Sequence, residues 1–362
     1  MWLDVCFARV VALRSLARPW PRLERLGGSR NAALTAPQFR ELSCSANSTN
    51  SKVTRRTSIL ALAGACALSA ASCSTIAQSR TPEHDFGVLV MAHGAGPAWN
   101  GEVEAMLAPL HRDYPMEIAF GMAEAASLQE GVAKLEAQGV NRIAVVRLFI
   151  SGESWYERTE QILGLAPGAP SRASGHSGHD DHGEHSMELW RIDTHSSFAL
   201  SDEGLADAPE TGAVLAERVR ELSRDPPRES VLVLAHGPED DDENQRWLAL
   251  IDARAEAVRQ TAPFRRVQAE TLREDWPDKR AASEARIRAF VEQAVQDDGR
   301  AIVIPYRVAG FGPYAEVLEG LAYVSDGRGL LPSAEVERWV RRQVEELRAG
   351  AFRAPQYEHR AG

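Results

Sequence analysis

Apolar runs that end at a histidine and a glycine occur twice in the pattern of hydrophobic and polar positions. One run covers residues 88–92 (VLVMA) and leads into His93. The other covers 231–235 (VLVLA) and leads into His236, and a glycine follows each histidine. A continuous apolar run of this length that stops at a turn residue is typical of a buried strand in a parallel sheet. The repeated phrase predicts two similar units, each with one histidine at the carboxyl end of a strand.

Strand-like and helix-like patterns alternate in both units. In the first unit we expect strands at 88–92, 116–120, 142–150 and 189–192, and helices at 102–112, 127–138, 155–163 and 210–222. In the second unit we expect strands at 231–235, 266–272 and 301–306, a short strand near 323, and helices at 244–260, 283–294 and 333–349. This alternation predicts an α/β fold of two tandem domains, each a parallel sheet flanked by helices.

The same pattern sets the expected domain limits. The first domain should span 85–224 and close with the helix at 210–222, and the second should span 229–349 and close with its last helix. A proline-containing linker at 225–228 joins them. Within the first domain, residues 165–187 are rich in glycine, serine, proline and histidine, which predicts an exposed loop.

Residues 1–73 follow a different pattern. An arginine pair precedes an apolar stretch at 59–71, and small residues lead up to Cys73. The stretch is shorter than a bilayer span and has the proportions of a secretory signal. We therefore expect an exported protein, either periplasmic after cleavage near Ala71 or anchored to the membrane as a lipoprotein through a lipidated Cys73. A leader that is not used as a signal is the remaining alternative.

The net charge and the positions of the cysteines limit the partners and the metal ligands that we expect for this chain. A formal net charge of −10 argues against a nucleic-acid partner. All four cysteines lie before residue 74, so a metal site in the two domains must use histidine, aspartate or glutamate. No Gly-rich phosphate loop, nucleophile elbow or CxxC pair occurs, and this argues against an exported α/β hydrolase.

His93 and His236 are the first candidates for a functional site. Open α/β sheets bind ligands at the carboxyl ends of their strands, and imidazole both binds divalent metals and titrates near neutral pH. The alternative is a structural histidine that caps the following helix or hydrogen bonds to a nearby carbonyl group. The recurrence of the same phrase in both units favours a function.

These motifs resemble the class II chelatases, the sirohydrochlorin cobalt or iron chelatases of cobalamin and sirohaem synthesis. The resemblance rests on the two strand-Ala-His-Gly phrases and on Leu148-Phe149-Ile150-Ser151 after the third strand, and it covers residues 85–345 as two tandem units. It implies insertion of Co²⁺, Fe²⁺ or Ni²⁺ into a tetrapyrrole without ATP. It also implies that His93 and His236 bind the metal and take part in removing the pyrrole protons.

The chain departs from the family pattern at the other ligand positions. The family's second histidine, after strand three, corresponds to Glu153 in the first unit and to no ligand in the second. The family's acidic residue after strand two corresponds to the region of Glu124 in the first unit and to Glu274 in the second. The resemblance therefore implies catalytic roles for both strand histidines and Glu274, with Glu124 and Glu153 as further metal ligands. The alternative for the three carboxylates is an ordinary place on the surface.

A histidine tract lies in the loop predicted at 165–187. His176, His179, His182 and His185 recur every third residue among three acidic residues. Such a composition predicts binding of Zn²⁺, Ni²⁺, Co²⁺ or Cu²⁺ of moderate affinity and poor selectivity, because a glycine-rich loop must be ordered on binding. The tract either collects metal for the neighbouring site or is a solvated insert without a role.

Two further segments have two interpretations each. The acidic run at 239–243 either attracts cations to the site or begins a helix, where negative charge suits the helix dipole. The segment 310–314, with Phe311 and Tyr314, either stacks on a tetrapyrrole or forms a tight turn with packed rings.

Two functions are therefore open. The first is an exported chelatase that binds a divalent metal and inserts it into a tetrapyrrole. The second is a metal or tetrapyrrole binding protein of the same fold without turnover, which export and the missing second histidines favour.

Overall fold

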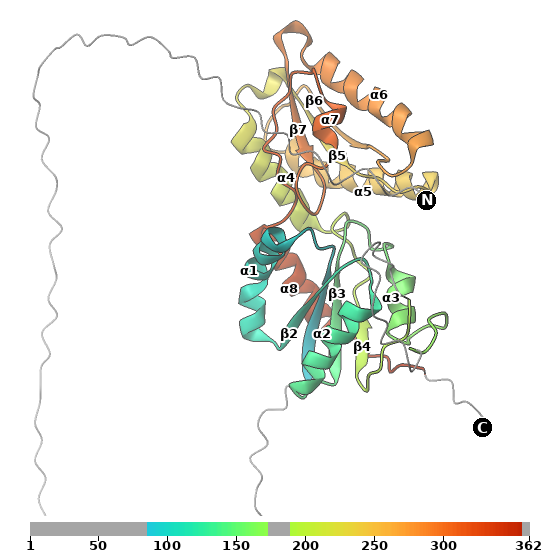
Figure 1. Ribbon diagram of the computed structural model, residues 1–362. Helices are drawn as coiled ribbons and strands as arrows, with labels where there is room; N and C mark the ends of the chain where they lie inside the picture. The colour runs from blue at the N-terminus through green and yellow to red at the C-terminus, as the bar shows by residue number, and fades with distance from the viewer. Residues whose placement is uncertain (1–84, 173–188, 357–362) are drawn as a thin grey trace, which may run out of the picture. The chain divides into compact units, whose positions relative to one another are not determined.

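The computed structural model describes residues 85–172 and 189–356, drawn in colour in Figure 1. These residues all belong to one compact unit, which spans Ile76–Gly362. The predicted leader at 1–73 and the histidine tract at 176–185 lie outside the described residues. None of the helices within the described ranges combines the length and the apolar character of a bilayer span.

The first sheet holds four parallel strands in the order β2-β1-β3-β4. They are β1 (Phe86–Ala92), β2 (Met116–Phe120), β3 (Arg142–Leu148) and β4 (Ser197–Leu200), and helices α1 (Pro97–Asp113), α2 (Ala125–Ala137) and α3 (Tyr156–Ile162) follow β1, β2 and β3. Every residue of β1 is buried, and Ala92 at its end lies level with Phe120 of β2 and Leu148 of β3. The carboxyl ends of three neighbouring strands therefore meet at one edge of the sheet.

The second sheet has the parallel order β6-β5-β7. Its strands are β5 (Glu229–Ala235), β6 (Arg266–Thr271) and β7 (Arg300–Pro305), with helices α5 (Asp241–Arg259), α6 (Pro277–Ala294) and α7 (Tyr314–Val317) and short 3₁₀ turns at Pro226–Arg228 and Gln296–Asp298. β5 is central and fully buried, and Ala235 lies level with Thr271 of β6. The predicted fold class, two parallel sheets flanked by helices, is confirmed.

The strand predicted at 189–192 is wrong. In that segment Arg191 forms only an isolated bridge with Ser171, and the fourth strand is β4, where Phe198, Ala199 and Leu200 are buried. The apolar pattern misleads because Trp190 and Ile192 are also buried, although they do not join the sheet ladder. The strand expected near 323 is likewise reduced to one bridge between Val324 and Ile302.

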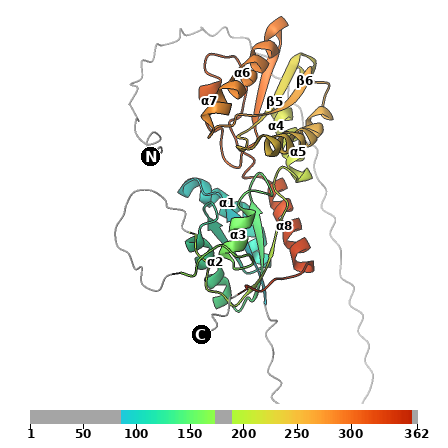
Figure 2. The same cartoon turned by 90° about the vertical axis from the view of Figure 1, so that its right-hand side faces the viewer.

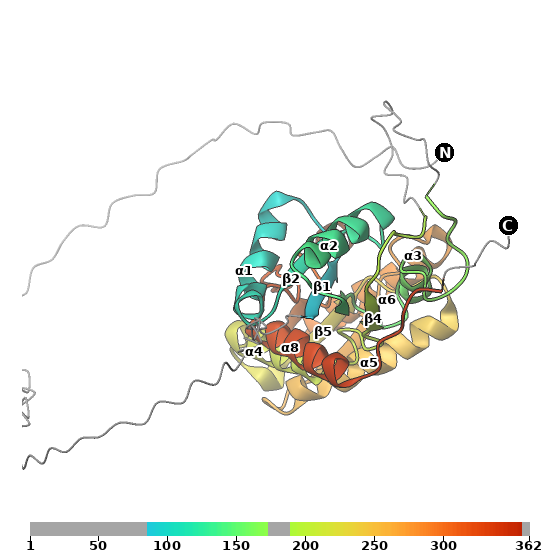
Figure 3. The ribbon, with the colours of Figure 1, turned by 90° about the horizontal axis from the view of Figure 1, so that it is seen from below.

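The last helix of each predicted domain packs on the sheet of the other. Helix α4 (Pro209–Leu222) lies against α5 and β7, and helix α8 (Ala334–Ala349) lies against β3, β4 and α1 (Figures 2 and 3). This differs from the expectation that 210–222 closes the first unit and 333–349 the second. Both helices are amphipathic, and an apolar face must be buried but does not specify which sheet buries it. The main hydrophobic core consequently runs through both sheets.

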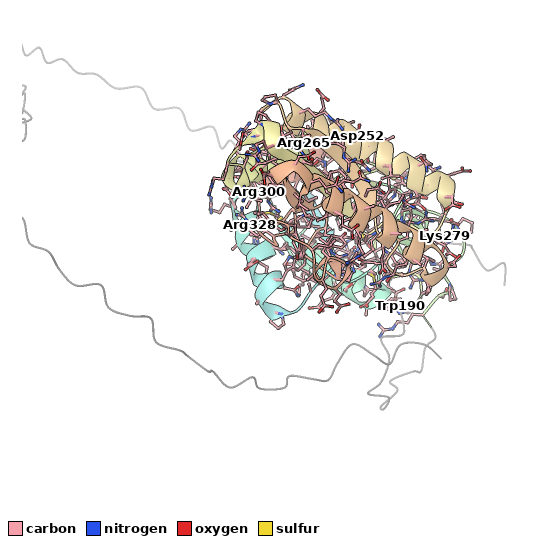
Figure 4. The ribbon with its side chains drawn as sticks, turned by 90° about the horizontal axis from the view of Figure 1, so that it is seen from above. Trp190, Asp252, Arg265, Lys279, Arg300 and Arg328 are labelled. Atoms are coloured by element: carbon pink, nitrogen blue, oxygen red, sulfur yellow. The ribbon has the colours of Figure 1, made fainter. Side chains whose placement is uncertain are left out.

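Polar contacts hold α4 against the second sheet. Arg300, at the start of β7, donates to the carbonyl of Leu222 at 3.0 Å, and Arg328 pairs with Glu221 at 2.5 Å (Figure 4). Both acceptors belong to the last residues of α4, where cations also suit the helix dipole. The end of α4 is thereby tied to the sheet that follows it in sequence.

The chain passes twice between the sheets, after β4 and before α8. Tyr306, directly after β7, forms buried contacts with the first passage and with α4. Its hydroxyl donates to the carbonyl of Leu205 at 2.8 Å and lies 2.7 Å from Thr211 Oγ1. Glu203 connects the same passage to α8, because it accepts hydrogen bonds from Trp339 Nε1 at 2.8 Å and from Arg342 at 2.6 Å. These contacts fix the first passage, residues 201–208, to β7 and to α8.

Candidate functional site

His93 and His236 occupy equivalent places at the carboxyl ends of the two central strands. Each is followed by a glycine with positive φ, 61° at Gly94 and 79° at Gly237, a conformation that costs glycine little. Nδ1 of His93 lies 3.0 Å from the Gly94 carbonyl oxygen, and Nδ1 of His236 lies 3.2 Å from that of Gly237. A carbonyl oxygen only accepts, so in the neutral form of each ring Nδ1 carries the proton and Nε2 is the acceptor.

Both histidines line one cavity of about 670 Å³ at these strand ends. Phe149 and half of the eight tryptophans in the chain face it. The lining from the first sheet and its loops is His93, Ala95, Trp99, Met122, Phe149, Ile150, Ser154 and Trp155. The lining from the second is His236, Pro238, Glu239, Glu243, Trp247, Glu274, Asp275, Trp276, Arg307, Val308 and Ala309. The flat tryptophan rings on both sides of the cavity suit a large planar ligand.

The two histidines differ in their surroundings. His93 is exposed, whereas His236 is largely enclosed and its ring centroid lies 4.9 Å from that of Trp247. Burial lowers the pKa of His236 below the ordinary value of 6.5, and the charge of Arg307 lowers it further, while the carboxylates of Glu274 and Asp275 oppose the shift. The imidazole of His236 is therefore neutral at pH 7 and able to accept a proton.

Glu274 lies next to His236 in the cavity wall. Its backbone N–H donates to the His236 carbonyl at 3.3 Å, and its carboxylate Oε2 lies 2.5 Å from Nη1 of Arg307. The ion pair is mostly shielded from solvent, with 14% of the Glu274 side chain and 20% of the Arg307 side chain exposed. The Glu274 carboxylate therefore lines the cavity as one half of an ion pair with the Arg307 guanidinium.

Glu153 and Glu124 do not line the cavity. Glu153 receives two hydrogen bonds from Arg246 of α5, at 3.0 and 2.8 Å, although the next residues of its loop, Ser154 and Trp155, do face the cavity. Glu124 occupies the N-cap position of α2, and its carboxylate lies against Gly121. The structure brings together His93, His236 and Glu274 and leaves the other two carboxylates outside this group.

No three histidine, cysteine, aspartate or glutamate side chains within residues 85–172 and 189–356 are grouped so that they could hold a metal ion. The cavity offers separate nitrogen and oxygen donors rather than a closed cage. Structural metal sites are fully ligated by the protein, whereas sites that act on a ligand keep positions open. An ion here would complete its coordination with water or with a bound ligand.

The acidic run at 239–243 combines both of its predicted roles. Asp240 is the N-cap of α5 and accepts from the Glu243 N–H at 2.8 Å, while Glu239 and Glu243 face the cavity. Burial, together with the nearby charges of Glu153 and Asp240, raises the pKa of Glu243, although the hydrogen bond from Trp247 Nε1 opposes the shift.

The segment 310–314 is a packed turn. The Phe311 ring contacts those of Tyr314 and Tyr323 and does not line the cavity.

Arg147, in the middle of a run that sequence analysis treats as strand, shapes the wall beside Trp155. Its buried guanidinium donates to the carbonyl groups of Gly152, Ser154 and Ser201 and lies over the Tyr156 ring at 4.5 Å. A charged residue inside an apolar strand was the available signal. The roles of Arg307 and of the four tryptophans depend on tertiary contacts and had no such signal.

Comparison with known proteins supports a chelatase relationship. Residues 87–183 match the family model CbiX, and no curated protein matches the chain. Similar solved structures include a multi-domain protein from Deinococcus radiodurans with structural similarity to chelatases (16% identity, TM-score 0.46, 74% of this chain and 57% of the other). The chain thus spans little more than half of that protein.

Two further solved structures are similar to this chain. The sirohydrochlorin chelatase SirB from Bacillus subtilis subspecies spizizenii, in complex with cobalt, is 13% identical with a TM-score of 0.47 and coverage of 74% and 99%. CbiX, described as the terminal enzyme for biosynthesis of siroheme in denitrifying bacteria, is 16% identical with a TM-score of 0.43 and coverage of 73% and 100%. The part of this chain that matches the CbiX family model, residues 87–183, holds most of β1, the histidine that follows it and all of β3.

Proposed function

We propose that this protein inserts a divalent metal ion into a tetrapyrrole of the sirohydrochlorin type. The observation that carries the proposal is the placement of His93 and His236, one from each central strand, on a single aromatic cavity. The family match and the cobalt bound to SirB support the same chemistry. The tetrapyrrole and the metal, which is cobalt, iron or nickel, are both substrates.

In this proposal the two histidines have different tasks. His93, exposed at the cavity and with Nε2 free, binds the incoming ion, which keeps water on its other positions and is easily passed on. His236, neutral because burial lowers its pKa, accepts a pyrrole proton as the metal–nitrogen bonds form. The tryptophans hold the macrocycle between the two side chains. Insertion replaces two pyrrole N–H protons with one divalent ion, so a second base is required, and we assign this role to Glu243, which lines the cavity and whose pKa is raised.

A second function is favoured by one specific observation. Because Arg307 already neutralises Glu274 and no three-residue ligand group exists in the described part of the chain, the cavity suits a carrier of a metal or tetrapyrrole as well as an enzyme. Export to the periplasm, with or without a lipid on Cys73, is part of this proposal and fits the carrier best. The tract at His176, His179, His182 and His185 is proposed to collect metal for either function.

Mixing the full chain with Co²⁺ and sirohydrochlorin separates the two functions. An enzyme converts many equivalents of tetrapyrrole, followed by its absorption spectrum, and His93→Ala and His236→Ala each slow conversion at least 100-fold. His111→Ala, an exposed histidine on α1, is the matched control and keeps the rate. Stoichiometric binding without turnover indicates the carrier, and unchanged turnover in both cavity variants contradicts the proposed site.

A further inference from the structure

The charge distribution on the cavity wall is asymmetric. Among its lining residues from the first sheet, His93 is the only ionisable one, whereas the second sheet contributes His236, four carboxylates and Arg307. The arginine nearest in sequence to the cavity in the first sheet, Arg147, directs its guanidinium to backbone carbonyls instead. A permanent cation therefore faces the cavity only beside His236.

Arg307 is held in place from several sides. It follows β7 by two residues, its guanidinium lies 5.5 Å from the centre of the Tyr314 ring, and a side chain at Gly312 would come within 2.6 Å of its guanidinium carbon. Burial disfavours its charge, but the hydrogen bond and charge of Glu274 outweigh this and raise its pKa. The guanidinium is consequently a fixed positive charge and not a mobile side chain at the rim.

The Arg307 guanidinium is bound to the carboxylate that a metal ion beside His236 would need. A divalent ion bound by His236 and Glu274 must either displace the guanidinium from the carboxylate or share the carboxylate with it. Displacement breaks a charge-assisted hydrogen bond in a shielded place, and sharing puts two cations within a few ångströms of each other. Both outcomes disfavour the ion.

We propose that Arg307 takes the place of a metal ion beside His236 and Glu274, so that the cavity binds its divalent substrate only at His93. The proposal rests on the proposed function for the existence of a metal substrate, but not on turnover. It makes Arg307 the residue that determines which of the two equivalent histidines binds metal. It also leaves His236 free of metal and available as a proton acceptor.

Cobalt binding to the full chain tests this assignment. Because the histidine tract would mask other sites, the parent protein carries His176, His179, His182 and His185 replaced by Gln, and Co²⁺ is titrated by calorimetry and by its visible absorption. In the parent, His93→Ala weakens binding at least tenfold and His236→Ala changes it less than threefold. Arg307→Met, which keeps much of the side-chain volume but removes the charge, creates a second site or tightens binding at least tenfold.

Two controls make the result specific. Adding Glu274→Gln to Arg307→Met abolishes the gain, because the gain requires the released carboxylate, and Arg307→Lys shows no gain because the cation is retained. Thermal unfolding of each variant verifies that it is folded, and Arg307→Gln replaces Arg307→Met if the latter is not. Parent binding that depends on His236, or a folded Arg307 variant without any gain, overturns the proposal. If the Arg307 variant gains cobalt binding through Glu274 but the protein does not metallate sirohydrochlorin, the proposal about Arg307 is upheld. Only the enzymatic function is then rejected.

Discussion

The hydroxyl groups of Tyr306 and Thr211 lie 2.7 Å apart in the interior of the protein, and they join the end of β7 to the helix α4 that packs on the second sheet. Tyr306 is fully buried, and its hydroxyl also donates to Leu205. Leu205 belongs to the first passage between the sheets, so the Tyr306 hydroxyl links this passage to the end of β7.

Replacing Tyr306 by Phe should destabilise the protein by about 1–3 kcal/mol, because the buried Leu205 carbonyl loses a hydrogen-bond donor. Urea unfolding measures the effect. Tyr114→Phe is the control, since the Tyr114 ring retains its edge contact with Phe86. Equal stability of the two variants would show that the Tyr306 hydroxyl does not stabilise the fold.

Glu229 should make stability depend on pH in the acidic range. Burial raises the pKa of this carboxyl, but hydrogen bonds from Ser223, Arg224 and Arg300 outweigh burial and lower the pKa below 4.5. A group whose folded pKa is depressed stabilises the protein above its unfolded pKa and loses that contribution as the pH falls through the folded value.

Glu229→Gln should therefore lower the free energy of unfolding by about 1–3 kcal/mol at pH 7 and flatten its decline below pH 4.5. Denaturant unfolding between pH 3 and pH 7 measures both. The exposed Glu345→Gln variant should follow the wild-type curve. A Glu229→Gln curve parallel to the wild type over the whole range would refute the assignment.

His236 should titrate below 6.5, because burial and Arg307 disfavour its charged form. Its depressed pKa means that the unfolded chain binds the proton more readily, so stability falls as the pH drops through the window between 6.5 and the folded value. The ring resonances of His236, assigned by comparison with His236→Gln, report the midpoint directly. A midpoint at or above 6.5 would contradict the enclosed position beside Trp247.

Arg147 should position the cavity wall at Ser154 and Trp155. Arg147→Lys cannot supply the three carbonyl acceptors with donors in the same geometry, so it should cost about 1–3 kcal/mol of stability. It should also weaken tetrapyrrole binding several-fold while leaving Co²⁺ binding at His93 intact. Tryptophan fluorescence quenching by sirohydrochlorin measures the affinity, with the exposed Arg220→Lys as control. Loss of both ligands together would indicate general unfolding instead of positioning.

The two central strands were predictable because most of their residues are apolar. β1 and β5 are buried at every residue, so their sequence pattern alone marks them and places a histidine at each end. β4 was missed because it has only four residues and lies close to the equally apolar Trp190 and Ile192. Local pattern cannot tell a buried bridge from a short strand.

The partners of side chains were not predictable. Nothing in the local sequence shows that Arg246 binds Glu153 across 93 positions or that Arg307 binds Glu274, because these pairs are formed by the packing of distant elements. The exchange of α4 and α8 could not be predicted for the same reason. The sequence of an amphipathic helix shows that one face is buried but does not specify which sheet buries it. The two histidines were found because the strand-Ala-His-Gly phrase that contains them occurs twice, whereas Arg307 belongs to no repeated phrase.

The most direct test of the site is the position of cobalt in crystals of the full chain grown with Co²⁺ and sirohydrochlorin. Anomalous scattering at the cobalt edge locates the ion without reference to turnover. The proposed function predicts a peak inside the aromatic cavity, next to Nε2 of His93 and on the face of the tetrapyrrole. Cobalt bound at Glu124 or Glu153, or a tetrapyrrole seated outside the cavity, would contradict it.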